Sequence, residues 1–128
     1  MDTSRIRLLF VVLGVLTLAS VSGHASGRRS AKQNLTGTLV DITCATDPKR
    51  NLAKLRSEHT RRCLLMPTCV ESGYALLTDH DEVLRFNAKG EELARKLIEK
   101  HLHTQSWRVS IEGIVQGDEL TVERIRLL

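Results

Sequence analysis

The chain has 128 residues and a formal net charge of +4, with 19 Lys and Arg against 15 Asp and Glu. Aromatic residues make up only 3% of it, whereas a nucleic-acid surface needs basic and aromatic side chains on the same strands. The composition therefore argues against nucleic acid as a partner, and the length leaves room for one domain with one modest core.

The first 25 residues have the pattern of a secretory signal peptide. Two arginines precede an apolar run from Leu8 to Ala19, and small residues follow through Ser26, with cleavage expected after Gly23 or Ala25. The alternative is a retained anchor, which needs about 20 apolar residues to span a bilayer. Because this run is shorter, we expect residues 1–25 to be removed, no stable membrane insertion afterwards, and a secreted or periplasmic protein.

Residues 26–34 are basic and predict a flexible leader, and residues 35–128 predict the folded domain. The segment from Leu35 to Thr43 alternates apolar and polar residues and is rich in β-branched types, which indicates a first strand. Asp47 followed by Pro48 is typical of a helix start. The sequence therefore predicts a helix from Pro48 to about Arg62, with Leu52, Leu55 and His59 on one face.

The rest of the chain predicts two hairpins separated by a helix. Strands are expected at Tyr74–Thr78 and Val83–Phe86, and again at Trp107–Val115 and Leu120–Leu127. Leucines and isoleucine at helical spacing predict a helix over Glu91–Leu102. The residues expected to share one core are Leu39, Leu76, Leu84, Leu93, Leu97, Val109, Ile111 and Val122.

The apolar phase of the last strand slips between Val122 and Ile125, which predicts a β-bulge. Five strands with a helix between the third and the fourth is the element order of an OB-fold. We therefore expect an α+β protein that is mostly β with two helices. It would be an OB-like five-stranded barrel, with a helical segment carrying Cys and His inserted after the first strand.

Several short motifs spread over Leu35–Leu127 carry a resemblance. They are G-T-L-V-D-I-T-C (37–44), H-T-R-R-C (59–63), C-V-E-S-G-Y-A-L (69–76), F-N-A-K-G (86–90), V-S-I-E-G-I-V (109–115) and L-T-V (120–122). The chain resembles a group of small exported bacterial proteins of uncharacterised function. Those proteins combine a G-x-x-x-D-x-x-C strand with H-x-x-x-C, C-x-x-S-G and a terminal strand pair. The resemblance implies an exported OB-like domain and no known activity.

The three cysteines permit two kinds of chemistry. In an oxidising compartment one disulfide is expected among Cys44, Cys63 and Cys69, with one cysteine left over. Such a bridge would staple the inserted segment to the sheet and contribute about 2–4 kcal/mol.

The second kind of chemistry adds His59, which makes a Cys3His ligand set with Cys44, Cys63 and Cys69. His59 and Cys63 are four residues apart and would share one face of the predicted helix. Such a set suits zinc, or copper as Cu(I) with Met66 nearby. Asp41 would either orient His59 as a supporting carboxylate or bond to the neighbouring loop.

No catalytic pattern stands out, because the chain has no Ser/His/Asp arrangement, no phosphate-binding glycine loop and no paired carboxylates in a plausible cleft. We therefore expect no catalytic residues and no organic cofactor. The sequence favours an exported small binding or envelope protein whose partner is another envelope protein or a small ligand. The alternative is a thiol-dependent redox enzyme or redox sensor that uses Cys63 or Cys69.

Overall fold

The structure is a computed structural model and describes residues 30–128. The predicted signal peptide, residues 1–25, lies outside the described residues, as does the first part of the leader. Within residues 30–128 the fold is α+β, with five strands in one sheet and five helices. None of these helices is long and apolar enough to cross a membrane.

The five strands form one sheet that closes on itself in the order β1-β2-β3-β5-β4. They are β1 (Gln33–Asp41), β2 (Tyr74–Thr78), β3 (Val83–Phe86), β4 (Arg108–Gln116) and β5 (Glu119–Leu127). β1 closes the sheet because its first part pairs with β4 and its second part pairs with β2, both antiparallel. β3 and β5 are parallel, and the β2–β3 and β4–β5 hairpins are antiparallel as predicted.

The predicted bulge in the last strand is confirmed. Glu112 of β4 faces Arg124, whereas the next residue, Gly113, faces Val122, so Glu123 is the extra residue of β5. The backbones approach closely here. A Cβ atom on Gly113 would lie 2.4 Å from the carbonyl oxygen of Thr121, so any larger residue would push the two strands apart.

The main core fills the inside of the closed sheet, and the predicted core residues are confirmed. Leu39, Leu76, Leu84, Val109, Ile111 and Val122 are buried in one cluster, and Leu93 and Leu97 pack against it. The cluster also holds Trp107, which is 1% exposed.

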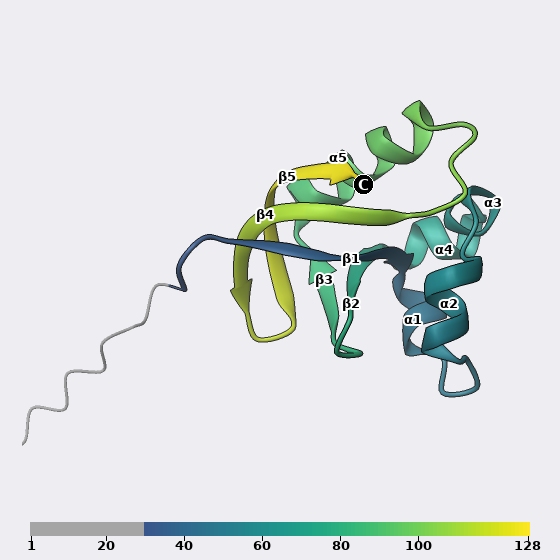
Figure 1. Ribbon diagram of the computed structural model, residues 1–128, viewed down its shortest axis with the longest axis horizontal. Coiled ribbons are helices and arrows are strands. Elements are labelled where there is room, and N and C mark those ends of the chain that lie inside the picture. The colour runs from purple at the N-terminus through teal and green to yellow at the C-terminus, as the bar shows by residue number, and fades with distance from the viewer. Residues whose placement is uncertain (1–29) are drawn as a thin grey trace, which may run out of the picture.

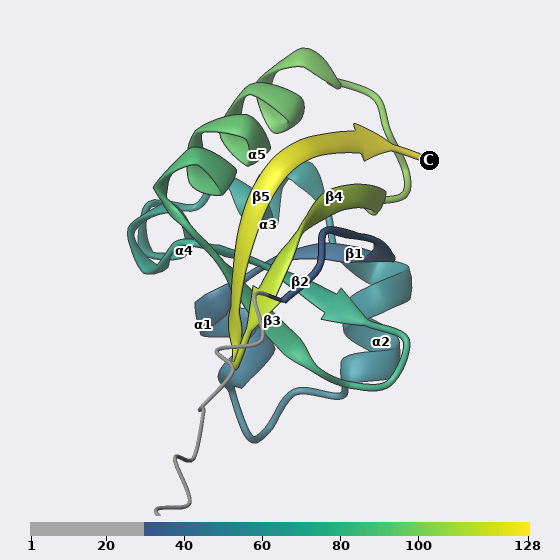
Figure 2. The ribbon, with the colours of Figure 1, turned by 90° about the vertical axis from the view of Figure 1, so that its left-hand side faces the viewer.

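Helix α5 (Ala88–Lys100) lies between β3 and β4 in the chain, as predicted. Asn87 caps it, because its side-chain oxygen accepts the N–H of Gly90 at 3.0 Å and also the N–H of Val122 at 3.1 Å. One side chain therefore fixes the start of α5 against β5. Figures 1 and 2 show α5 lying along one side of the sheet, where the Arg61 side chain donates to the Ile98 carbonyl oxygen at 3.0 Å.

The predicted single helix from Pro48 to Arg62 is wrong. Residues 42–73, called the helical segment below, contain four short helices: α1 (Ile42–Thr46), α2 (Leu52–Glu58), α3 (Arg61–Leu64) and α4 (Pro67–Ser72). They gather at one end of the sheet (Figure 1). The prediction of only two helices therefore missed α1 and α4 and fused α2 with α3.

Side-chain caps explain the break between α2 and α3. Asn51, not Asp47, caps α2, because its side chain accepts the N–H of Lys54 at 3.1 Å. Thr60 caps α3 by accepting the N–H of Cys63 at 3.2 Å, and both His59 and Thr60 have extended backbone. Asp47 instead closes a turn by accepting the N–H of Lys49 at 2.9 Å. Each cap starts a new helix, so no continuous helix forms.

Candidate metal centre

Asp41 stands where β1 ends and α1 begins. It caps α1, because its Oδ1 atom accepts the N–H of Cys44 at 2.8 Å. This capping explains why β1 ends at Asp41, two residues before the predicted end at Thr43. It also places the Cys44 thiol next to the Asp41 carboxylate, and both side chains are buried.

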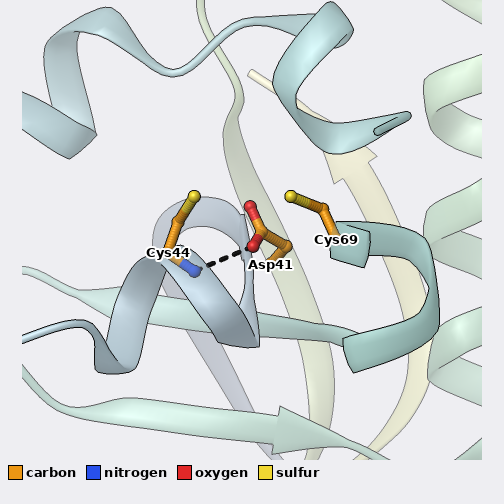
Figure 3. A group of neighbouring side chains, drawn as sticks. All are labelled: Asp41, Cys44 and Cys69. Atoms are coloured by element: carbon orange, nitrogen blue, oxygen red, sulfur yellow. Dashed lines mark hydrogen bonds between the residues drawn. The ribbon is translucent and has the colours of Figure 1, made fainter. Parts of the chain in front are cut away.

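Cys69 reaches the same place from α4. Pro67 starts this helix, and α4 is tied to α1 because the Thr43 N–H donates to Ser72 Oγ at 3.2 Å. The ligand-type atoms of Asp41, Cys44 and Cys69 all lie within 4.8 Å of one another. Figure 3 shows the carboxylate of Asp41 standing between the two sulfur atoms. Three buried groups from three elements therefore converge.

His59 completes the surroundings of Asp41. It lies at the C-terminal end of α2, and its Nε2 atom faces Asp41 Oδ2 at 3.3 Å. The side chains of His59 and Asp41 are 2% and 0% exposed. Neither Nε2 nor Oδ2 has a hydrogen-bond partner in the part of the chain that the structure describes, so the 3.3 Å contact is not aligned as a hydrogen bond. Asp41 Oδ2 and His59 Nε2 are therefore both available to bind a further group.

The site combines one charged carboxylate with two neutral thiols. Burial raises the pKa of the Asp41 carboxyl, but His59, the Cys44 N–H and the two thiols outweigh it and lower that pKa to about 2. Burial, together with the Asp41 charge, raises the pKa of Cys44 to about 12 and also raises the pKa of Cys69. Without a bound cation, the site therefore holds a carboxylate and two protonated thiols at neutral pH.

Of the predicted ligand set, the structure brings Cys44 and Cys69 together and leaves Cys63 out. The Sγ atom of Cys63 accepts a hydrogen bond from Thr60 Oγ1 at 3.2 Å, and Cys63 is not in the group of converging atoms. The reason is the break at Thr60, which puts His59 and Cys63 on different helices. Asp41 is the added member, and the D-x-x-C spacing of a capping Asp was the signal for it.

The predicted disulfide is not formed, because all three cysteines are free thiols in the structure. Asp41 does contact His59, as the sequence suggested. The alternative expected a bond to a neighbouring loop, but the group that donates to Asp41, the Cys44 N–H, lies in helix α1.

The distance between the two unpaired atoms fits a shared cation. In tetrahedral zinc sites the bonds to oxygen and nitrogen are about 2.0–2.1 Å, which sets neighbouring ligand atoms about 3.3–3.4 Å apart. The 3.3 Å between His59 Nε2 and Asp41 Oδ2 has this length. His59 is outside the group of mutually close atoms, so its ring would have to turn toward the sulfurs to complete the shell. The buried Asp41–Cys44–Cys69 cluster could therefore hold a metal ion, with His59 as its neighbour.

Comparisons of the chain with protein-family models, with curated proteins and with solved structures found no match.

Proposed function

We propose that this protein is an exported OB-like domain that binds one zinc ion through Asp41, Cys44, Cys69 and His59. The observation that carries the proposal is a pair of buried atoms beside two thiols, Asp41 Oδ2 and His59 Nε2. They stand 3.3 Å apart, and neither has a hydrogen-bond partner among residues 30–128. Buried polar atoms are normally paired, so an unpaired set of metal-ligand type points to an ion.

The OB-like assignment is supported by the order of the elements. The sheet closes through β1, β3 and β5 are parallel, and α5 connects β3 to β4. This is the connectivity expected of a five-stranded Greek-key barrel. The metal site would lie at the end of β1, where the inserted helical segment covers one end of the barrel.

Charge favours zinc over copper at this site. Asp41 with two thiolates carries three negative charges, of which Zn²⁺ offsets two and Cu(I) only one. A buried site with the smaller residual charge costs less free energy. Copper remains the competitor because two thiolates also suit Cu(I).

Export is supported by the charged, apolar and small-residue regions of residues 1–25. Intact-mass measurement on protein from its native host tests it, and we expect a mature chain that begins near Ser26. Recovery of cytoplasmic protein that still begins at Met1 would contradict export.

Zinc titration of reduced, metal-free protein against a chromophoric chelator tests the metal site. We expect one equivalent bound, with affinity reduced at least 100-fold in Cys44→Ser and Cys69→Ser and at least tenfold in Asp41→Asn and His59→Gln. Because both thiols are protonated beforehand, binding at neutral pH should release two protons per ion. Cys63→Ser is the matched control and should bind as the wild type does.

Cobalt substitution adds a test of the ligand set, since the sulfur-to-cobalt charge-transfer band grows with each bound thiolate. Two thiolates are expected, and the band should not change in Cys63→Ser. A three-thiolate band that falls in Cys63→Ser would restore the Cys3His set. Absence of zinc and cobalt binding by the wild-type protein would overturn the metal site.

A redox role for Cys69 has less support than the metal site. A nucleophilic cysteine needs a lowered pKa, and burial raises the pKa of Cys69. Cys69 is also only 4% exposed.

A further inference from the structure

A cavity of about 350 Å³ lies beside the metal centre, between the turn before α2 and the start of α3. His59 and Cys63 stand in its wall, together with Lys49, Arg50, Lys54 and Glu58. Ligand sites for small molecules begin at about 300 Å³, so the cavity has room for one small organic molecule.

The charges around the cavity favour an anion. Three cationic side chains line it against one carboxylate. Lys54 is paired with Glu58 at 3.6 Å, and Arg50 lies 3.9 Å from Asp47 outside the wall, but these side chains are all at least 40% exposed. Exposed pairs of this kind hold their partners weakly. Lys49 makes no ion pair within residues 30–128. A negatively charged molecule would therefore meet an excess of positive charge.

Cys63 adds a reactive thiol to the cavity wall, where it lies near His59. Cys63 is the most accessible thiol, since it is half-buried whereas Cys44 and Cys69 are 6% and 4% exposed. His59 is 6% exposed, and its Nε2 atom has no hydrogen-bond partner among the described residues. This nitrogen faces Asp41 Oδ2 at 3.3 Å and belongs to the proposed metal site, so Cys63 is the reactive group that the cavity offers to a ligand.

We propose that this cavity binds small anionic disulfides and that Cys63 forms a mixed disulfide by exchange with them. The Cys63 thiol loses its proton to solvent, and its sulfur attacks one sulfur of the small disulfide. The S–S bond of that molecule breaks, the leaving thiolate keeps the electron pair, and a Cys63–S–S–R bond forms. The small disulfide is the oxidant. Lys49 and Lys54 attract its carboxylates to the cavity.

The test uses the reduced full-length mature chain and two small disulfides of opposite charge. The probes are the dianion 5,5′-dithiobis(2-nitrobenzoate) and the dication cystamine, each compared with its own rate toward free cysteine. We expect a single adduct, on Cys63 by peptide mass spectrometry, and an anion-to-cation rate ratio at least tenfold above that of free cysteine. High salt should reduce this ratio, because exposed charges are screened.

Charge reversal at the cavity makes the test specific. Lys49→Glu alone should reduce the anion-to-cation rate ratio several-fold. Lys49→Glu with Lys54→Glu should bring this ratio down to that of free cysteine. Lys96→Glu, on the exposed face of α5, is the matched control and should leave it unchanged. Lys49 lies in a turn, so its single variant remains informative if the double variant is destabilised. The buried Trp107 reports folding in each variant.

Two results would overturn the proposal. One is an anion-to-cation rate ratio that equals that of free cysteine or that does not change in Lys49→Glu. Either result would make Cys63 an ordinary accessible thiol. The other is an adduct on Cys44 or Cys69 in place of Cys63. Zinc titration of Cys63→Ser reads the metal centre separately, so this proposal and the zinc proposal fail independently.

Discussion

The closed sheet with α5 and the helical segment, residues 42–73, are held together in different ways. The sheet encloses a core of apolar side chains that includes Trp107, Leu76 and Ile111. A second apolar cluster lies between the helical segment and strands β1 and β2, and it includes two cysteines, Cys44 and Cys69. Thiols therefore occupy positions that aliphatic side chains would fill in an ordinary core. The sheet is therefore stabilised by apolar burial, whereas the helical segment also depends on side-chain caps and on what its thiols bind.

Truncation in the core of the sheet should have the largest effect. Leu76→Ala removes a fully buried side chain and should lower the free energy of unfolding by about 3–5 kcal/mol. Leu55→Ala in the helical segment should cost only about 2 kcal/mol, because the short helix α2 can close over the space. Urea unfolding followed by Trp107 fluorescence measures both. Equal costs would mean that the segment is as tightly packed as the sheet.

Zinc should stabilise the protein through the helical segment. At a free zinc concentration 100 times the dissociation constant, the free energy of unfolding should rise by about 2.7 kcal/mol. Cys44→Ser should lose this gain and Cys63→Ser should keep it. Hydrogen exchange should place the added protection in α1 and α4, which carry Cys44 and Cys69, more than in α5. Zinc-dependent protection confined to the sheet would contradict the assigned ligands.

Acid should weaken the metal-free protein through Asp41. The pKa of this carboxyl falls from its ordinary 3.8 to about 2 on folding, so its stabilising contribution is present above about pH 4 and is lost as the pH falls through 2. A shift of this size corresponds to about 2 kcal/mol. Asp41→Asn keeps a capping oxygen for the Cys44 N–H but has no charge to titrate.

Unfolding in urea at pH 6 and at pH 2.5 gives the comparison. Between these values the wild type should lose more stability than Asp41→Asn, because only the wild type takes up a proton at this site. Equal losses in the two proteins would show that Asp41 does not have its lowered pKa in solution.

The sheet with α5 was predictable from the sequence, whereas the helical segment was not. Strand alternation and helical spacing report apolar burial directly, so both hairpins, α5, the bulge after Val122 and the core were predictable. The helical segment is organised by competing caps at Asp41, Asn51 and Thr60, whose choice depends on tertiary contacts.

The residues of the candidate site were predictable only in part, for the same reason. Cys44, Cys69 and His59 were identified from their residue types alone. Cys63 was added because it follows His59 at helical spacing, and that spacing lost its meaning when Thr60 started a new helix. The full role of Asp41 required the pairing of β1 with its neighbours to be known, since only the end of a strand places its side chain between α1 and α4.

The smallest effect is expected at Thr60, the residue that separates α2 from α3. Thr60→Ala removes the oxygen that accepts the Cys63 N–H at 3.2 Å, and loss of such a cap costs about 1 kcal/mol. Thr60→Ser should restore most of it. The matched control is Thr36→Ala on β1, an exposed threonine for which we expect a change below about 0.5 kcal/mol.

Because Tyr74 holds α3 by donating its hydroxyl to the Leu64 carbonyl oxygen at 2.8 Å, the helix should stay in place and only its first turn should loosen. Hydrogen exchange of the Cys63 N–H should then rise without a change in zinc affinity. A fall in zinc affinity in Thr60→Ala would mean that α3 supports the metal centre after all.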